Sequence, residues 1–245
     1  MMLGKLPPKP HPAALPLMRL VGQMPQLPDA VDWTGKLQGN PVFCNDTLGC
    51  CTIASQAHII RVWTSRLWGV ELDIPDDLVR ETYFKLTGGP DIGLAETDAL
   101  AYWASQGFAL PDRQYQSLLT GWCTLDHQNG AHIRASIAWF GAAYLGLGMP
   151  LAAQNANAWD CVPNGDSNTQ PNSWGGHAVP AVAYDANGVT VISWGRLYKV
   201  SWPFLVAYLD EAHAPVSRMW LDTCGYAPSG FDLVGLENAM STIAT

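Results

Sequence analysis

The order of two hydrophobic patterns limits the folds open to this chain: helical spacing dominates up to about residue 140, and strand-like runs follow it. An apolar face with helical spacing begins at Cys51. Further helices are expected at 76–86, 97–107 and 130–140. The short apolar run 142–150 predicts a buried strand. Helices followed by strands in two blocks are typical of an α+β fold and not of alternating βαβ units.

The second block contains a hairpin signal. HAVPAVAY (177–184) and GVTVISW (188–194) predict two strands, joined by a turn that contains Asn-Gly. A long polar loop at 155–176 precedes them, and a loop of that length inside a compact domain is more often functional than decorative. Residues 201–213 return to helical spacing.

The expected organisation is one large domain with two termini of different character. Proline-rich residues 1–27 predict an extended arm. The domain itself covers 28–224, with a helical lobe at about 45–140 and a sheet lobe at about 141–224, and 225–245 form a weakly patterned tail. Prolines interrupt the N-terminus where a signal peptide needs a continuous apolar stretch, so a secretory signal is not expected.

Charge and composition exclude several classes of function. The net charge is −8 and long basic runs are absent, which argues against a nucleic-acid groove. No segment has the apolar length of a membrane span. Hydrophobic residues reach 48% and charged residues 14%, as in a folded protein, and the eleven tryptophans suggest packed lobes with an aromatic-lined cleft.

The six cysteines lack the paired spacings of a zinc site, so no metal or cofactor is expected. Most should be buried free thiols, although one or two disulfides remain possible.

Cys51 is different because it opens a predicted helix, whose N-terminus favours a thiolate. Gly49 would allow a substrate backbone to approach, and Asn45 could donate an N–H to an oxyanion. The alternative is that both Cys50 and Cys51 are small core residues.

His177 is the complementary candidate. It follows a glycine pair and opens a predicted strand beside the long loop, where its ring could act as a general base or as the partner of a thiolate. A lone histidine at such a place is more often structural. Cys51 lies far upstream, however, and Cys51 and His177 together predict a nucleophile and its base.

Four blocks over residues 28 to about 200 resemble papain-like cysteine peptidases. PDAVDW (28–33) is similar to the start of the mature enzymes, and Asn45, Gly49 and Cys51 match the family's Gln, Gly and nucleophilic Cys in spacing. Residues 177–184 and 193–195 resemble the family's histidine strand and its Ser-Trp-Gly. The resemblance implies a two-lobed fold in which a helical lobe carrying the Cys helix packs on an antiparallel sheet lobe carrying His177.

The same resemblance assigns roles. Cys51 and His177 would be catalytic and Asn45 would bind the oxyanion, with Cys51 preferred to Cys50 because adjacent side chains at a helix start point about 100° apart. The substrate cleft would include Gly49, Cys50, Trp174, Gly176 and Trp194.

Three positions depart from the pattern, and one of them is Thr52, where the family usually has an aromatic residue after the nucleophile. Asn45 is one methylene shorter than the usual glutamine. Counting back from Trp194 puts Ile192 where the family has the asparagine that orients the histidine, whereas counting forward from His177 selects Ser193. Only Ser193 could accept the imidazole N–H. Without an orienting group, a Cys–His pair remains with a less constrained ring.

The resemblance leaves two functions open, besides a transferase with the same thioester chemistry, which the sequence does not separate from a peptidase. One is a cysteine peptidase or amidase acting on protein or on the peptide part of peptidoglycan, encoded by a phage or prophage and acting in the host cytoplasm or virion. The other is a non-catalytic virion protein that keeps the fold and docks on neighbouring subunits through the N-terminal arm. The arm is too short to form a folded inhibitory domain, so an enzyme would be controlled by location or assembly.

The other polar residues are expected to be structural. Asp91 and Glu96 should be loop and helix-start carboxylates, His58 should lie at the surface or core edge, and His213 should end a helix. Trp159 and Asp160 could shape the cleft.

Overall fold

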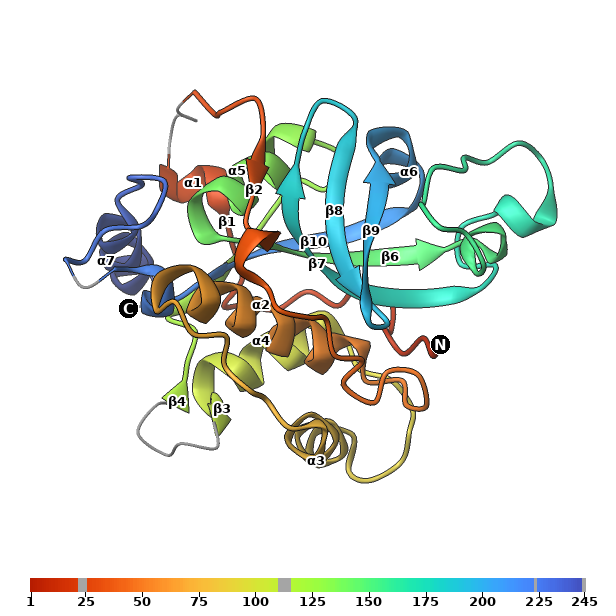
Figure 1. Cartoon of the computed structure of the whole chain (residues 1–245), viewed down its shortest axis with the longest axis horizontal. Helices are drawn as coiled ribbons and strands as arrows, with labels where there is room; N and C mark the ends of the chain where they lie inside the picture. Colours follow the sequence, from red (N-terminus) through yellow and green to blue (C-terminus); the bar gives the residue numbers. More distant parts are fainter. Residues whose placement is uncertain (22–25, 110–115, 223, 244–245) are drawn as a thin grey trace.

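The computed structural model describes residues 1–21, 26–109, 116–222 and 224–243 (Figure 1). The strands of its main sheet are β1 (Leu15–Pro16), β2 (Val31–Asp32), β5 (Gly121–Thr124), β6 (Ala143–Met149), β7 (Gly175–Tyr184), β8 (Gly188–Ser193), β9 (Arg196–Ser201) and β10 (Leu209–Val216). Their order is β1-β5-β10-β6-β7-β8-β9, and β2 pairs with β7. A separate pair is formed by β3 (Phe108–Ala109) and β4 (Gln116–Ser117). The path from β5 to β9 is antiparallel throughout.

The α-helices are α1 (Leu17–Val21), α2 (Cys51–Leu67), α3 (Asp76–Thr87), α4 (Glu96–Ser105), α5 (Gly130–Phe140), α6 (Trp202–Tyr208) and α7 (Leu233–Ile243). Four 3-10 turns cover Thr34–Lys36, Leu151–Ala153, Ser167–Thr169 and Arg218–Trp220. Helices α2, α3 and α4 gather below the sheet in Figure 1, and α5 and α6 lie among the strands above. The expected α+β class, with a helical layer against an antiparallel sheet, is confirmed.

Helix α2 is the centre of the core. Every residue from Cys51 to Ser65 is buried, so this helix is enclosed on all sides and is not the expected amphipathic surface helix. Arg61, near the C-terminal end of this buried run, forms an ion pair with Glu71 (2.6 Å). The Tyr144 hydroxyl donates to the Thr52 carbonyl (2.8 Å), which fixes the first turn of α2 against β6.

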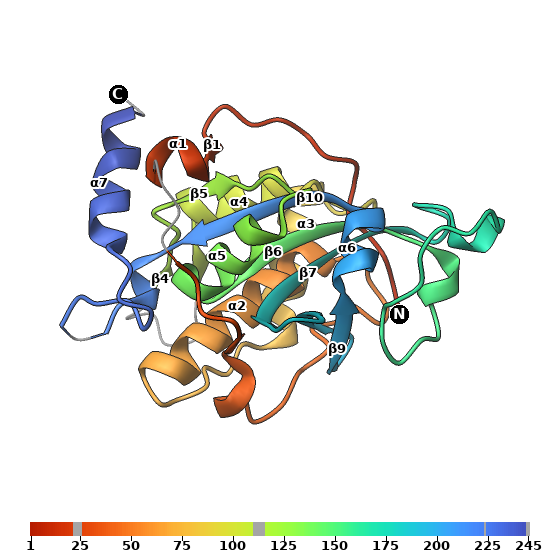
Figure 2. The same cartoon turned by 90° about the horizontal axis from the view of Figure 1, so that it is seen from above.

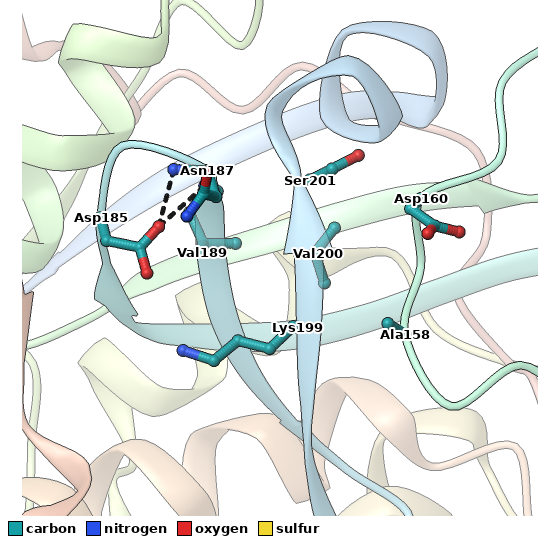
Figure 3. Close-up of a pocket in the computed structure, with 9 residues that line it drawn as sticks. Ala158, Asp160, Asp185, Asn187, Val189, Lys199, Val200 and Ser201 are labelled. Carbon is teal, nitrogen blue, oxygen red and sulfur yellow. Dashed lines mark hydrogen bonds between the residues drawn. The ribbon is translucent and has the colours of Figure 1, made fainter.

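The predicted hairpin is formed by β7 and β8. The Asp185 carboxylate accepts the backbone N–H groups of Asn187 (2.7 Å) and Gly188 (3.2 Å), which closes the turn (Figure 3). On its other side β7 pairs with β6, with His177 opposite Leu147. The start of β7 and the end of β8 therefore lie at the same end of the sheet, where His177 and Ser193 meet.

Three segments differ from the sequence-based expectations. Residues 201–213 form α6 followed by β10, because 209–216 are nearly all buried and fill a central place in the sheet between β5 and β6. His213 is thus in a central strand and does not end a helix. The arm, expected to be extended throughout, contains β1 and α1, and the weakly patterned tail contains α7. Within the described ranges, no helix is long and apolar enough to cross a bilayer.

Candidate active site

Cys51 is the first residue of α2 and Cys50 is its N-cap. The N–H groups of Ile53 and Ala54 both donate to the Cys50 carbonyl (3.0 Å). The aligned peptide dipoles of α2 nevertheless place a partial positive charge at its N-terminus, next to the Cys51 thiol. Cys51 is only 1% exposed. A thiol placed here can act as a nucleophile when solvent or substrate reaches it.

The Cys50 thiol lies against the loop that precedes α2. Its Sγ donates to the Phe43 carbonyl (3.3 Å), and burial raises the pKa of this thiol. Cys50, expected in the cleft, is thus a core residue. All six cysteines are free thiols.

The Cys51 sulfur lies against the strand that carries His177. Its Sγ accepts the backbone N–H of Ala178 (3.4 Å), the residue that follows His177. One turn further along α2, the Ser55 hydroxyl donates to the Ala178 carbonyl (3.0 Å). Residues distant in the chain are therefore joined at one point, where α2 meets the start of β7.

His177 is held by two neighbours. Its Nε2 is 2.7 Å from the Ser193 Oγ, and the Trp194 ring stacks on the imidazole at 4.2 Å between centroids. Among the described residues, Nδ1 has no hydrogen-bond partner. Ser193, at the end of β8, takes the position expected of an orienting residue. Ile192 is buried, and its side chain has no atom that could accept the imidazole N–H. Trp159, expected to shape the cleft, packs edge-on against the His177 ring (6.3 Å).

The turn between β8 and β9 places Trp194. Both Trp194 (φ 43°) and Gly195 (φ 81°) have left-handed backbone conformations, a combination typical of the two-residue hairpin turn that matches strand twist. This turn brings the indole over His177 and directs its N–H toward the N-terminal arm.

Asn45 and Trp194 direct side-chain N–H groups at one carbonyl oxygen. The Asn45 amide donates to the Met2 carbonyl (3.4 Å) and to the Leu48 carbonyl (3.0 Å), and the Trp194 indole donates to the same Met2 oxygen (3.3 Å). Phe43 (φ 55°) and Cys44 (φ 59°) hold left-handed conformations just before Asn45, a cost that non-glycine residues accept only where the surrounding structure enforces it. Paired donors on one carbonyl have the form of an oxyanion-binding arrangement.

The first residues of the chain occupy the groove beside Cys51. The N–H groups of Gly4 (3.2 Å) and Lys5 (3.0 Å) donate to the Gly176 carbonyl, and the Leu94 N–H donates to the Gly4 carbonyl (2.8 Å). Met2 N–H donates to the Asn45 carbonyl (3.0 Å). In Figures 1 and 2 the N-terminus accordingly lies beside β9 and the chain that leads into α2. This segment, residues 1–6, is called the N-terminal strap below.

Glycines on both sides make room for the strap. A Cβ added to Gly4 would lie 1.8 Å from the Gly49 carbonyl oxygen, and one added to Gly176 would lie 2.2 Å from the Lys5 carbonyl oxygen. Trp174 borders the same groove, and the Asp91 carboxylate accepts the Gly49 N–H (3.0 Å). The expected cleft residues Gly49, Trp174, Gly176 and Trp194 thus surround the strap.

Burial sets the protonation of the two candidate groups. Burial raises the pKa of the Cys51 thiol to about 11, although the N–H groups of Ala178 and Gly4 act in the opposite direction. Burial lowers the pKa of His177 to about 3. Both groups are therefore neutral at pH 7 while the strap is in place. The cavity that Asn45, Cys51 and Ser193 share measures only about 10 Å³, about the minimum for one water molecule.

A second pocket, of about 320 Å³, lies between the β7–β8 hairpin, β9 and the loop that contains Asp160 (Figure 3). Lys199, which lines it, donates to the Thr190 hydroxyl (2.8 Å). Its lining residues include neither a thiol nor a histidine, and none of them borders the cavity beside Cys51. It offers no nucleophile–base pair.

The comparisons with known proteins agree with this geometry at the level of fold. Xylellain, a cysteine protease from Xylella fastidiosa, superposes with a TM-score of 0.67 and 16% identity over 87% of this chain and 95% of its own. The digestive procathepsin L2 proteinase of Tenebrio molitor gives 0.62 and 16% over 87% and 78%. A cysteine protease of Carica candamarcensis gives 0.56 and 17% over 77% and 98%. No family model and no curated protein sequence matches. The chain has the papain-like fold.

Proposed function

We propose that this protein is a cysteine peptidase whose N-terminal strap occupies its own active site. The observation that carries the proposal is the convergence at the start of β7: a helix-N-terminal thiol contacts the backbone next to His177, and two N–H donors meet on one carbonyl. A polypeptide backbone already lies hydrogen-bonded in this groove, which favours a peptide or protein substrate.

The reaction follows from these groups. His177 would take the Cys51 proton, and the thiolate would attack a substrate carbonyl whose oxygen accepts N–H groups from Asn45 and Trp194. The C–N bond then breaks as the imidazolium returns its proton to the leaving amine. Water, deprotonated by His177, hydrolyses the thioester and regenerates the thiol.

The test requires the strap to leave without altering any of these groups. Gly4→Ala does this, because the new Cβ cannot fit beside the Gly49 carbonyl. The variant is expected to cleave a denatured protein substrate, read out by mass spectrometry of the products. Cleavage should vanish in Gly4→Ala/Cys51→Ala. Gly39→Ala, whose Cβ meets nothing within 4 Å, is the matched control and should behave as wild type.

Ser193 should act by orienting His177. In the Gly4→Ala background, Ser193→Ala is expected to lower kcat about fivefold, since a net hydrogen bond contributes on the order of 1 kcal/mol. Ser193→Asn, whose amide oxygen can accept the imidazole N–H, should retain more activity than Ser193→Ala and keep the pH profile of kcat/KM. Equal losses in both variants, with unchanged profiles, would contradict an orienting role.

One observation favours a second function, a non-catalytic protein that retains the fold for its shape. The strap closes the site and leaves Cys51 and His177 neutral, a state without nucleophilic power at pH 7. On this alternative the protein would bind neighbouring subunits, for example in a virion, and a phage or prophage origin stays a prediction. Gly4→Ala would then cleave nothing, and Cys51 would react with iodoacetamide no faster than the exposed Cys224.

A further inference from the structure

The strap places one side chain, that of Lys5, in a buried acidic pocket. The Lys5 ammonium lies 2.9 Å from Asp210 Oδ1 and 3.1 Å from Glu211 Oε1, and its side chain is 1% exposed. A buried ammonium is tolerated only when carboxylates or other acceptors compensate for lost hydration. The surroundings of Lys5 are therefore built for a cation. Asp210, Glu211, Glu96, His213 and Gly146 are together called the Lys5 pocket.

Glu96 belongs to this pocket, and its carboxyl group makes no hydrogen bond elsewhere among the described residues. It is fully buried, and neither carboxyl oxygen has a hydrogen-bond partner among the described residues. Burial, together with the charge of Glu211, raises the pKa of the Glu96 carboxyl. His213 Nε2 faces Glu211 (3.2 Å) and Glu96 (3.8 Å) from β10. Glu96 is the first residue of α4, as expected of a helix-start carboxylate, but its side chain lies in this buried cluster.

Gly146 supplies the space. It lies in β6, and a Cβ at this position would meet the Lys5 Cε at 2.2 Å and Glu96 Oε1 at 2.9 Å. Any larger residue would fill the volume that the lysine stem uses. The cavity thus combines a glycine wall along the stem with carboxyl groups around the ammonium, which is the form of a recognition site for a long basic side chain.

We propose that the Lys5 pocket is the subsite that selects a lysine or arginine side chain of the substrate, and that Lys5 occupies it as an internal mimic. The inference rests on the proposed peptidase function. Gly4, the neighbour of Lys5, donates its N–H to the carbonyl of Gly176, next to His177, and its backbone is close enough to Cys51 to lower the pKa of that thiol, so the selected residue lies within two residues of the cleaved bond. An apolar side chain would leave the buried carboxyl groups without a cation, and this disfavours it.

The kinetic test uses the full chain as Gly4→Ala/Lys5→Ala, which vacates both groove and pocket. Peptide libraries scanned at two positions on each side of the cleaved bond should show, at one position, at least a tenfold higher kcat/KM for Lys or Arg than for norleucine. Asp210→Asn/Glu211→Gln should remove this preference. The exposed Asp77→Asn is the matched control and should keep it. Hydrolysis without any basic preference would overturn the subsite while leaving the peptidase proposal intact.

A binding test is independent of catalysis. With Cys51→Ala added to Gly4→Ala/Lys5→Ala, titration calorimetry with the acetylated, amidated peptide of residues 2–8 should give at least tenfold tighter binding than its Lys5→norleucine analogue. Equal affinities would overturn the inference. A clear lysine preference in binding, combined with no hydrolysis by the Cys51-containing variant, would support the pocket and contradict the peptidase.

Discussion

Alkylation of Cys51 by iodoacetamide at pH 7 is expected to become about 20-fold faster in Gly4→Ala than in the wild-type protein. The strap contributes to the burial that raises the pKa of the thiol to about 11, which leaves on the order of one thiolate in ten thousand at pH 7. In the wild type the rate should therefore rise about tenfold for each pH unit between 7 and 10.

The magnitude follows from two opposing effects. Returning the thiol to an ordinary pKa of about 8.5 raises its thiolate population roughly 300-fold at pH 7. A less basic thiolate is also a weaker nucleophile, which removes roughly a fifteenfold factor. The net gain is about 20-fold before easier access is counted, and an imidazolium partner would increase it.

Mass spectrometry of tryptic peptides measures the rate at each cysteine separately. Cys50, whose thiol faces the Phe43 carbonyl, is the internal reference and should not change. Gly39→Ala should leave all rates at wild-type values. An unchanged Cys51 rate in Gly4→Ala would mean that the strap does not protect the thiol.

His177→Ala, introduced into Gly4→Ala, is expected to lower peptide hydrolysis by roughly 10³-fold, because the thiol then has no base and the leaving amine no acid. Alkylation of Cys51 should also lose its advantage at neutral pH and follow the titration of an isolated thiol. This second readout separates a chemical role of the imidazole from a purely structural one.

His132→Ala is the matched control for this experiment. The His132 ring accepts the Asp126 N–H (3.1 Å) at the start of α5 and does not border the cavity beside Cys51. Hydrolysis should continue at the Gly4→Ala rate. Equal activity of His177→Ala and His132→Ala would remove His177 from the mechanism.

Local sequence signals were sufficient for several elements. The start of α2 at Cys51, the helix at 130–140 and the β7–β8 hairpin were all predicted, because periodicity and turn chemistry act over a few residues. Residues 209–216 could not be assigned from pattern, since a short run buried on both faces reads equally well as helix. Helix α2 is buried all round for a similar reason: its neighbours come from distant parts of the chain.

The candidate site, too, has features that the sequence predicts and features that only the tertiary structure determines. Cys51, His177, Asn45 and Ser193 could be named from local motifs and their resemblance to a family, because residue type and spacing are properties of the chain itself. The occupation of the groove by the strap and the pairing of Lys5 with Asp210 and Glu211 could not, since these contacts join residues far apart in the chain. The protonation of Cys51 and His177 depends on burial, and only the folded chain determines which groups lose contact with water.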